Sequence, residues 1–225
     1  MIDIKEIFNS DDDVAKYVSL WLSDNVDSTD LAGACEYAAD MHIPVLSVAP
    51  AHVNVIWPWL EKLNVKIEPR FYVDSVAGDA ISNIAINIKS VFKQGADGAQ
   101  LILHLGDMDK FADSLLAIRD DLFFNKDLSV GFDVFEIWPL DWTAVFENLK
   151  KTYASSLLLI MTHDDRDKSD FIGRIYGALE NWDADKNMEL HVMLGESYGR
   201  AEQVYRLVSA MRPELLDKLK IFVSY

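Results

Sequence analysis

Residues 95–106 read GADGAQLILHLG, a short turn that leads directly into a run of apolar residues. The glycines favour a turn, and the apolar run is too short for a buried helix, so it indicates a buried strand. Apolar runs of this kind recur along the chain, and stretches with helical spacing separate them. We predict strands at residues 16–22, 43–48, 65–73, 99–105, 129–137, 157–161, 189–194 and 220–224.

The alternation of strands with helices indicates the fold. We predict helices over residues 28–41, 51–63, 79–93, 109–123 and 200–211, and two more that begin near residues 141 and 169. Eight strands separated by helices in 225 residues predict an α/β fold, a single (βα)8 TIM-barrel domain over residues 1–225. An open doubly wound sheet is the alternative, but the sequence has no GxGxxG or Walker-type loop to support it.

Two prolines and the end of the sequence modify this prediction. Pro58 should kink or shorten the helix at 51–63, and Pro69 should weaken the strand at 65–73. The sequence stops directly after the eighth strand, so the final outer helix of the barrel is expected to be missing. An uncovered apolar strand is unfavourable. We therefore expect the N-terminal segment or a second subunit to cover it. Covering by a second subunit predicts a homo-oligomer.

Charge and composition exclude several classes of protein. The formal net charge is −16, which repels nucleic-acid phosphates and anionic membranes. The one cysteine, Cys35, allows no intramolecular disulfide, and we expect it to be a buried helical residue. The sequence shows no signal peptide and no apolar run of transmembrane length. We expect a cytoplasmic protein that binds a small molecule rather than nucleic acid or a membrane.

Three stretches carry a resemblance to a known family. Residues 35–53 read CEYAADMHIPVLSVAPAHV, residues 95–106 are quoted above, and Val134–Glu136 read VFE. Together they resemble the deoxyribose-phosphate aldolases, which are class I aldolases with a TIM-barrel fold. The resemblance implies a Schiff-base lysine on strand six, a second lysine on strand seven and an aspartate on strand four. Here Gln100 stands at the aspartate position, and residues 157–161 and 192–194 contain no lysine.

Polar residues nevertheless gather where a barrel active site is expected, at the C-terminal ends of the strands. Side chains alternate along a strand, so His104 should share the inward face with Gln100. Glu136 should end strand five and His163 strand six. The candidate catalytic residues are therefore His104, Glu136, His163 and Gln100.

Three interpretations of His104 and Glu136 stay open at this stage. They could form an acid/base pair, in which Glu136 orients His104 or raises its pKa. With His163 they could hold a divalent metal, although no cofactor is required. They could also be a hydrogen-bonded pair without chemistry.

Further polar and aromatic side chains near the strand ends are candidates for substrate binding. They are Ser47, Asp74, Trp138, Glu196, Ser197 and Arg200. We expect a divergent lyase- or isomerase-like enzyme that acts on a small carbonyl or sugar-phosphate-like compound without the usual lysine. The alternative is a non-catalytic relative of the aldolases that binds a small molecule or a partner.

Overall fold

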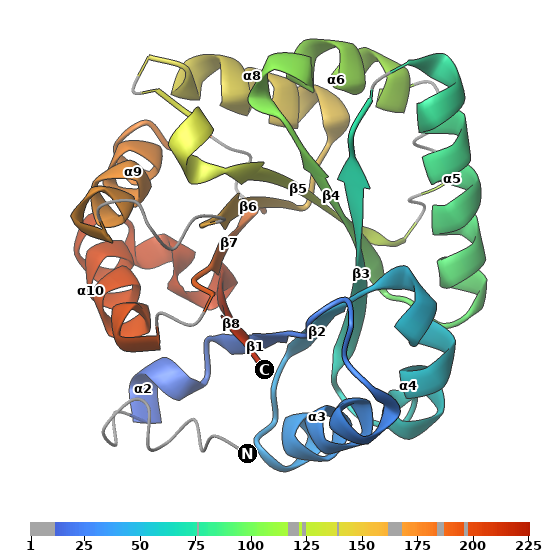
Figure 1. Cartoon of the computed structure of the whole chain (residues 1–225). Helices are drawn as coiled ribbons and strands as arrows, with labels where there is room; N and C mark the ends of the chain where they lie inside the picture. The colour runs from blue at the N-terminus through green and yellow to red at the C-terminus, as the bar shows by residue number, and fades with distance from the viewer. Residues whose placement is uncertain are drawn as a thin grey trace.

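A computed structural model shows a closed barrel of eight parallel strands, paired in chain order from β1 to β8 and back to β1 (Figure 1). The structure describes residues 12–75, 77–116, 122, 125–138, 140–161, 168–183, 187–195 and 198–225. The strands are β1 (Val18–Trp21), β2 (Val45–Val48), β3 (Lys66–Val73), β4 (Gly98–Leu103), β5 (Asp127–Asp133), β6 (Ser156–Ile160), β7 (Glu189–Met193) and β8 (Leu219–Ser224). This confirms the predicted TIM barrel.

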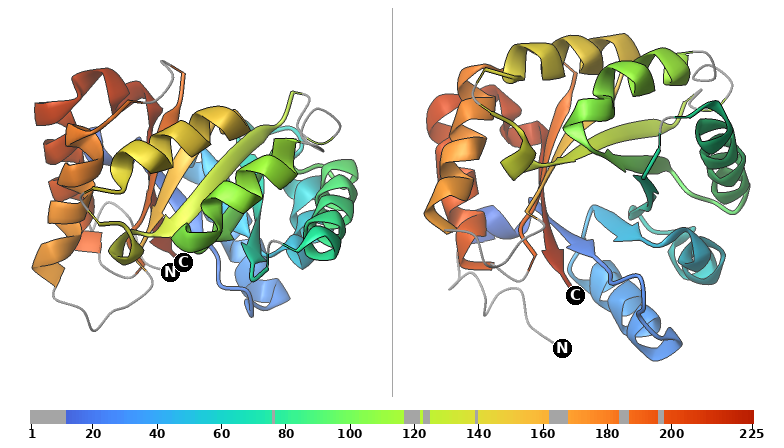
Figure 2. Two further views of the ribbon diagram at one scale, coloured as in Figure 1. Left: turned by 90° about the horizontal axis from the view of Figure 1, so that it is seen from above. Right: turned by 45° about the horizontal axis from the view of Figure 1, so that its top comes forward.

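Helices surround the barrel, as the two further views in Figure 2 show. The α-helices are α2 (Asp12–Ala15), α3 (Ser28–Asp40), α4 (Val53–Leu60), α5 (Gly78–Lys93), α6 (Met108–Leu116), α8 (Trp142–Thr152), α9 (Lys168–Glu180) and α10 (Ala201–Met211). The 3-10 turns are η1 (Pro50–His52), η2 (Leu105–Asp107), η3 (Val134–Glu136), η4 (Tyr198–Arg200) and η5 (Pro213–Lys218). No described helix is long and apolar enough to cross a membrane.

One of the predicted elements differs from the structure in a way that matters for the site. Strand β5 ends at Asp133, four residues earlier than predicted, and the chain then turns through η3 (Val134–Glu136). Strand β3 runs unbroken through Pro69, where Pro69 pairs in register with Val48 of β2. Pro58 does lie in a short helix, α4, which ends at Leu60.

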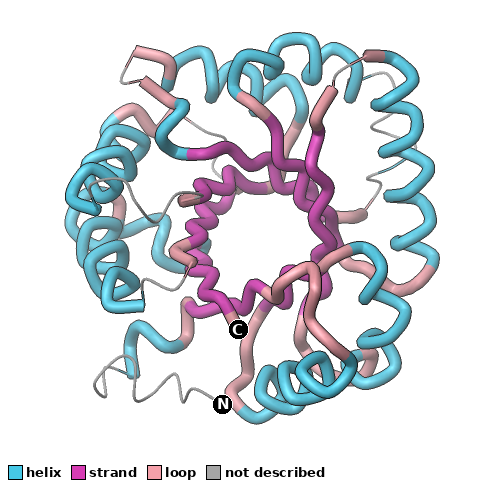
Figure 3. The backbone as a smooth tube through the Cα atoms, viewed as in Figure 1, coloured by secondary structure: helices cyan, strands magenta, loops and turns pink. Residues whose placement is uncertain are grey.

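Figure 3 shows the ring of strands inside the surrounding helices. The buried side chains form two apolar clusters, one on each side of this ring. The larger cluster lies between the strands and the helices. The smaller one lies inside the barrel and contains Val45, Ile102, Leu158, Ile160, Met193 and Phe222, with Trp21 packed against it. The interior of the barrel is therefore filled by side chains, and a ligand site has to lie at one of its ends.

The outer face of β8 is covered by the chain itself. Ile221 and Val223 are buried in the same cluster as Val14 and Tyr17, which come from the N-terminal part of the chain. Both β8 side chains are buried within this one chain, Ile221 at 0% and Val223 at 1% exposure. The uncovered strand is thus no longer a reason to expect a second subunit.

Candidate active site

His104 and Glu136 meet at the C-terminal end of the barrel. His104 is the residue after β4, and Glu136 is the last residue of η3. Nδ1 of His104 lies 2.9 Å from Oε1 of Glu136, and the backbone N–H of Leu105 donates to Oε2 of the same carboxylate at 3.0 Å. Because both carboxylate oxygens are bonded, Glu136 is fixed in place and in turn orients the imidazole.

The environment of His104 favours its protonated form. The hydrogen bond to Glu136 and the charge of that carboxylate raise the pKa of His104 above its usual 6.5, with smaller contributions from Asp107 and Asp74. Little burial opposes this shift, because the His104 side chain is 70% exposed. The ordinary pKa of histidine lies close to neutral pH, so histidine is a common general acid or base, and here the upward shift of the pKa stabilises the imidazolium form.

The pair lies in the wall of a cavity of about 210 Å³. Its lining residues come from the ends of β3, β4 and β5 and from the segments that follow them: Tyr72, Val73, Asp74, Ile102, Leu103, His104, Asp133 and Glu136. Asp74, a candidate for substrate binding, therefore lies in the same cavity as the histidine. The cavity combines an apolar floor with several polar groups, as small-molecule sites do.

A second cavity, of about 350 Å³, lies at the same end of the barrel and shares Tyr72 with the first. Its central feature is Arg70, whose side chain is 1% exposed and ion-paired with Asp24. The guanidinium also lies 4.2 Å from the ring centroid of Trp21. Sequence reasoning missed Arg70, although the inward direction of every second β3 side chain could have indicated it.

Ser47 and Gln100 lie inside the barrel, below the two cavities. Both are fully buried, and neither lines a described cavity. The Ser47 hydroxyl donates to Oε1 of Gln100 at 2.7 Å, and Nε2 of Gln100 donates to Glu68 at 3.0 Å. Nη1 of Arg70 in turn donates to the Ser47 hydroxyl at 3.1 Å. In this arrangement Ser47 holds Arg70 by a hydrogen bond, and Gln100 holds Ser47 in the same way.

The remaining candidates lie elsewhere. Trp138 lines a third cavity, of about 460 Å³, beside α6 and α8. Glu136 lines both this cavity and the His104 cavity. Arg200 contacts Sδ of Met161 at 3.5 Å and lines none of the three cavities. The last three candidates lie outside the described residues: His163, Glu196 and Ser197.

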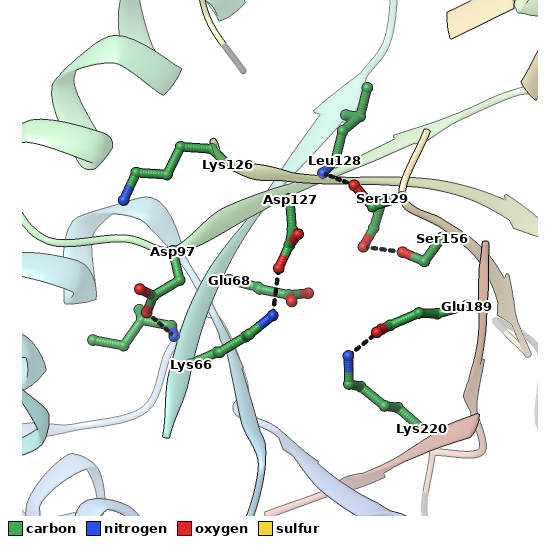
Figure 4. Close-up of polar contacts among 12 residues, drawn as sticks. Lys66, Glu68, Asp97, Lys126, Asp127, Leu128, Ser129, Ser156, Glu189 and Lys220 are labelled. Carbon is green, nitrogen blue, oxygen red and sulfur yellow. Dashed lines mark hydrogen bonds and ion pairs between the residues drawn. The ribbon is translucent and has the colours of Figure 1, made fainter. Parts of the chain in front are cut away.

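Two lysines inside the barrel lie at its opposite, N-terminal end (Figure 4). Nζ of Lys66, the first residue of β3, lies 2.5 Å from Asp127, the first residue of β5. Burial favours the neutral amine of Lys66, but the hydrogen bond to Asp127 and the charge of nearby carboxylates outweigh it and raise the pKa. Lys220 pairs with Glu189, the first residue of β7. Imine formation needs a neutral amine in the pocket, and these ion pairs oppose it.

The residues that the structure describes include no group of three His, Cys, Asp or Glu side chains placed to hold a metal ion. The sequence-based metal hypothesis used His104, Glu136 and His163, and the last of these is not described. Cys35 is buried on α3, and burial raises the pKa of its thiol to about 12, so it is not a reactive nucleophile.

Comparisons with known proteins agree with the fold. No family model and no curated protein matches the chain. The structure is similar to a deoxyribose-phosphate aldolase from Aeropyrum pernix described as tetrameric, with a TM-score of 0.72 and 13% identity, over 99% of this chain and 90% of that one. It is also similar to a proposed deoxyribose-phosphate aldolase from Coccidioides immitis, with a TM-score of 0.69 and 10% identity, over 93% of this chain and 81% of that one.

A protein described as a decarboxylase is also similar in fold. Orotidine 5′-monophosphate decarboxylase from Methanocaldococcus jannaschii matches with a TM-score of 0.55 and 14% identity, over 93% of this chain and 89% of that one. At such identities the comparisons establish the aldolase-like TIM barrel that the sequence resemblance implied. The function has to be argued from the site itself.

Proposed function

We propose that this protein is an aldolase-related lyase or isomerase that moves protons on a small carbonyl or sugar-phosphate-like compound without a Schiff-base lysine. The observation that carries the proposal is the His104–Glu136 pair, 2.9 Å apart in the wall of a cavity at the C-terminal end of the barrel. Active sites of TIM-barrel enzymes lie at this end.

In the proposed mechanism, His104 is the acid/base. The carboxylate of Glu136 accepts a hydrogen bond from Nδ1–H, which leaves the lone pair of Nε2 as the base. Nε2 takes a proton from the carbon next to a carbonyl group, and Glu136 stabilises the imidazolium that forms. Return of the proton to a neighbouring atom completes an isomerisation. In a lyase reaction Nε2 instead takes the proton of a hydroxyl group on the carbon β to the carbonyl. The bond between the α and β carbons then breaks as that oxygen forms a new carbonyl group, and the proton goes to the carbanion left on the α carbon.

Tyr72 is placed to assist this chemistry as a hydrogen-bond donor. It lines the same cavity as His104. Burial raises the pKa of Tyr72, against the opposing charge of Arg70, so its hydroxyl keeps its proton at neutral pH. A phenol that keeps its proton can donate to the substrate oxygen on which negative charge develops.

A second candidate is a non-catalytic relative that binds a small molecule or a partner. The exposure of His104 favours it, because water screens a general base that is 70% exposed. The Trp138 side chain, which is 66% exposed, would then be part of a binding surface beside Glu136.

Hydrogen–deuterium exchange in D2O, followed by proton NMR, separates the two candidates. The substrates are dihydroxyacetone phosphate, glyceraldehyde 3-phosphate, deoxyribose 5-phosphate and pyruvate, each incubated with the full chain. We expect exchange next to the carbonyl of at least one compound, and a loss of about 100-fold in His104→Gln, the size usual for a general base. Glu147→Gln, an exposed position on α8, is the matched control and should retain the wild-type rate.

The same measurement can contradict the proposal. If no compound exchanges, the non-catalytic candidate is favoured. If His104→Gln exchanges as fast as the wild type, another group is the base.

We also propose that the chain forms a homo-oligomer through α4 (Val53–Leu60). Val55 and Trp59 are four residues apart and share one face of this helix, where their exposed fractions are 40% and 48%. Leu63 follows the helix and is also exposed. A group of large exposed apolar side chains is typical of a protein interface.

A further inference from the structure

The guanidinium group of Arg70 is buried near the C-terminal end of the barrel. Nη2 of Arg70 donates to the carbonyl oxygen of Leu22 at 2.5 Å and to Oδ1 of Asp24, and Nη1 donates to Ser47. Nε of Arg70 is buried and has no hydrogen-bond partner among the described residues. A buried charge with an unsatisfied donor costs free energy, so a group with this geometry is more typical of a ligand site than of a structural ion pair.

The cavity beside Arg70 has the size and chemistry of a small-anion site. Its volume is about 350 Å³, and its lining residues are Trp21, Ser23, Asp24, Arg70, Tyr72, Met193, Ser224 and Tyr225. Among them Arg70 carries the positive charge, hydroxyl groups can donate further hydrogen bonds, and Trp21 and Met193 supply apolar contact. One cation with hydroxyls and apolar walls suits a monoanion with a short carbon chain.

Asp24 shows that a carboxylate can pair with this guanidinium. Its side chain is 49% exposed, on the turn that follows β1, whereas Arg70 is 1% exposed. A carboxylate therefore already reaches the guanidinium from a solvent-exposed turn. Carboxylates match the planar fork of donors on arginine. A ligand carboxylate would need the same donors that Asp24 occupies.

We propose that this cavity binds the carboxylate of a small organic acid through Arg70, and that Asp24 competes with the ligand for the same donors. The site does not depend on the acid/base role of His104, because binding requires no reaction. Since Tyr72 lines both cavities, an acid bound at Arg70 lies next to the His104 cavity.

Isothermal titration calorimetry with pyruvate on the full chain tests the proposal. We expect the wild type to bind pyruvate and Asp24→Asn to bind it about 10-fold more tightly, because the competing carboxylate is gone. Arg70→Lys keeps the charge but loses the planar fork, and should bind at least 10-fold more weakly. Asp217→Asn, at an exposed position on η5, removes the same charge elsewhere and should bind like the wild type.

Several results would overturn the proposal. One is equal affinity in the wild type, Asp24→Asn and Arg70→Lys, or no binding to any of them. Another is tighter binding of inorganic phosphate than of pyruvate, which would assign the site to a different anion. Circular dichroism of each variant checks its fold, and Asp24→Asn keeps the proposal testable if Arg70→Lys does not fold. Glu136→Gln separates this site from the acid/base proposal, because it should slow deuterium exchange and keep pyruvate binding.

Discussion

Nδ1 of His104 lies 2.9 Å from Oε1 of Glu136, although 32 residues separate the two in the sequence. The contact forms because β4 and β5 are neighbours in the barrel and η3 turns Glu136 back toward the end of β4. The order of the strands in the barrel therefore brings together the two residues of the proposed acid/base pair.

The pKa of His104 should depend on Glu136. We expect NMR titration of its ring protons to give a pKa above 6.5 in the wild type and a lower value in Glu136→Gln, because the hydrogen bond and the charge of Glu136 are its largest causes. Asp74→Asn is the control and should lower the pKa much less, since Asp74 contributes least. A wild-type His104 that titrates at 6.5 would contradict this account of the pair.

The pH dependence of catalysis should follow the same group. The base is neutral His104, so kcat/KM should rise with pH up to the raised pKa of His104 and then level off. In Glu136→Gln the midpoint of this rise should move to lower pH while the maximal rate falls. The measurement is kcat/KM against pH with the fastest-exchanging substrate. The same midpoint in both proteins would show that another group titrates.

Acid should destabilise the N-terminal end of the barrel. Burial raises the pKa of Glu189, but the hydrogen bond to His191 and the charge of Lys220 outweigh it and hold the pKa at about 2, below its usual 4.5. A lowered carboxylate pKa stabilises the fold above pH 4.5, and this contribution is lost as the pH falls from 4.5 toward 2.

Replacing this carboxylate tests the claim. Glu189→Gln should lower the free energy of unfolding by about 2 kcal/mol at pH 7, measured by urea denaturation, because about 1.4 kcal/mol corresponds to one pKa unit and the group is partly exposed. The difference from the wild type should shrink as the pH falls below 4.5. Glu202→Gln, in a pair of exposed side chains on α10, is the control and should change stability by less than about 1 kcal/mol. A difference between wild type and Glu189→Gln that does not depend on pH would contradict this linkage.

Association should depend on the exposed face of α4. We expect light scattering after size-exclusion chromatography to give more than one protomer for the wild type and one for Trp59→Glu. Leu140→Glu also places a charge on an exposed apolar residue, 92% exposed, but away from α4, and should not change the mass. A wild-type protein with the mass of one protomer would contradict the proposed interface at α4.

The sequence was sufficient for the fold because each strand is a local apolar run and each helix a local periodic pattern. It also indicated His104, since alternation along one strand places it on the inward face with Gln100. Alternation indicates which face of a strand a side chain occupies, but not how far it lies from the end of the barrel. Gln100 and Ser47 were therefore expected at the site but lie in the buried network beneath it.

Arg70 was missed for a different physical reason. Its role depends on Trp21 and Asp24, which lie on and just after β1, across β2 from β3 and 46 or more residues away in sequence. Such contacts follow from strand register and turn conformation, and no local pattern in one sequence specifies them.

In the proposed function, this barrel transfers protons without an imine-forming lysine. The most direct test is borohydride trapping with the compound that shows the fastest deuterium exchange, read by intact mass and peptide mapping. We expect no substrate-dependent mass increase, because Lys66 and Lys220 are ion-paired at the opposite end of the barrel. A reduced adduct on any lysine of a protein that catalyses exchange would contradict the claim and identify the chain as a Schiff-base enzyme.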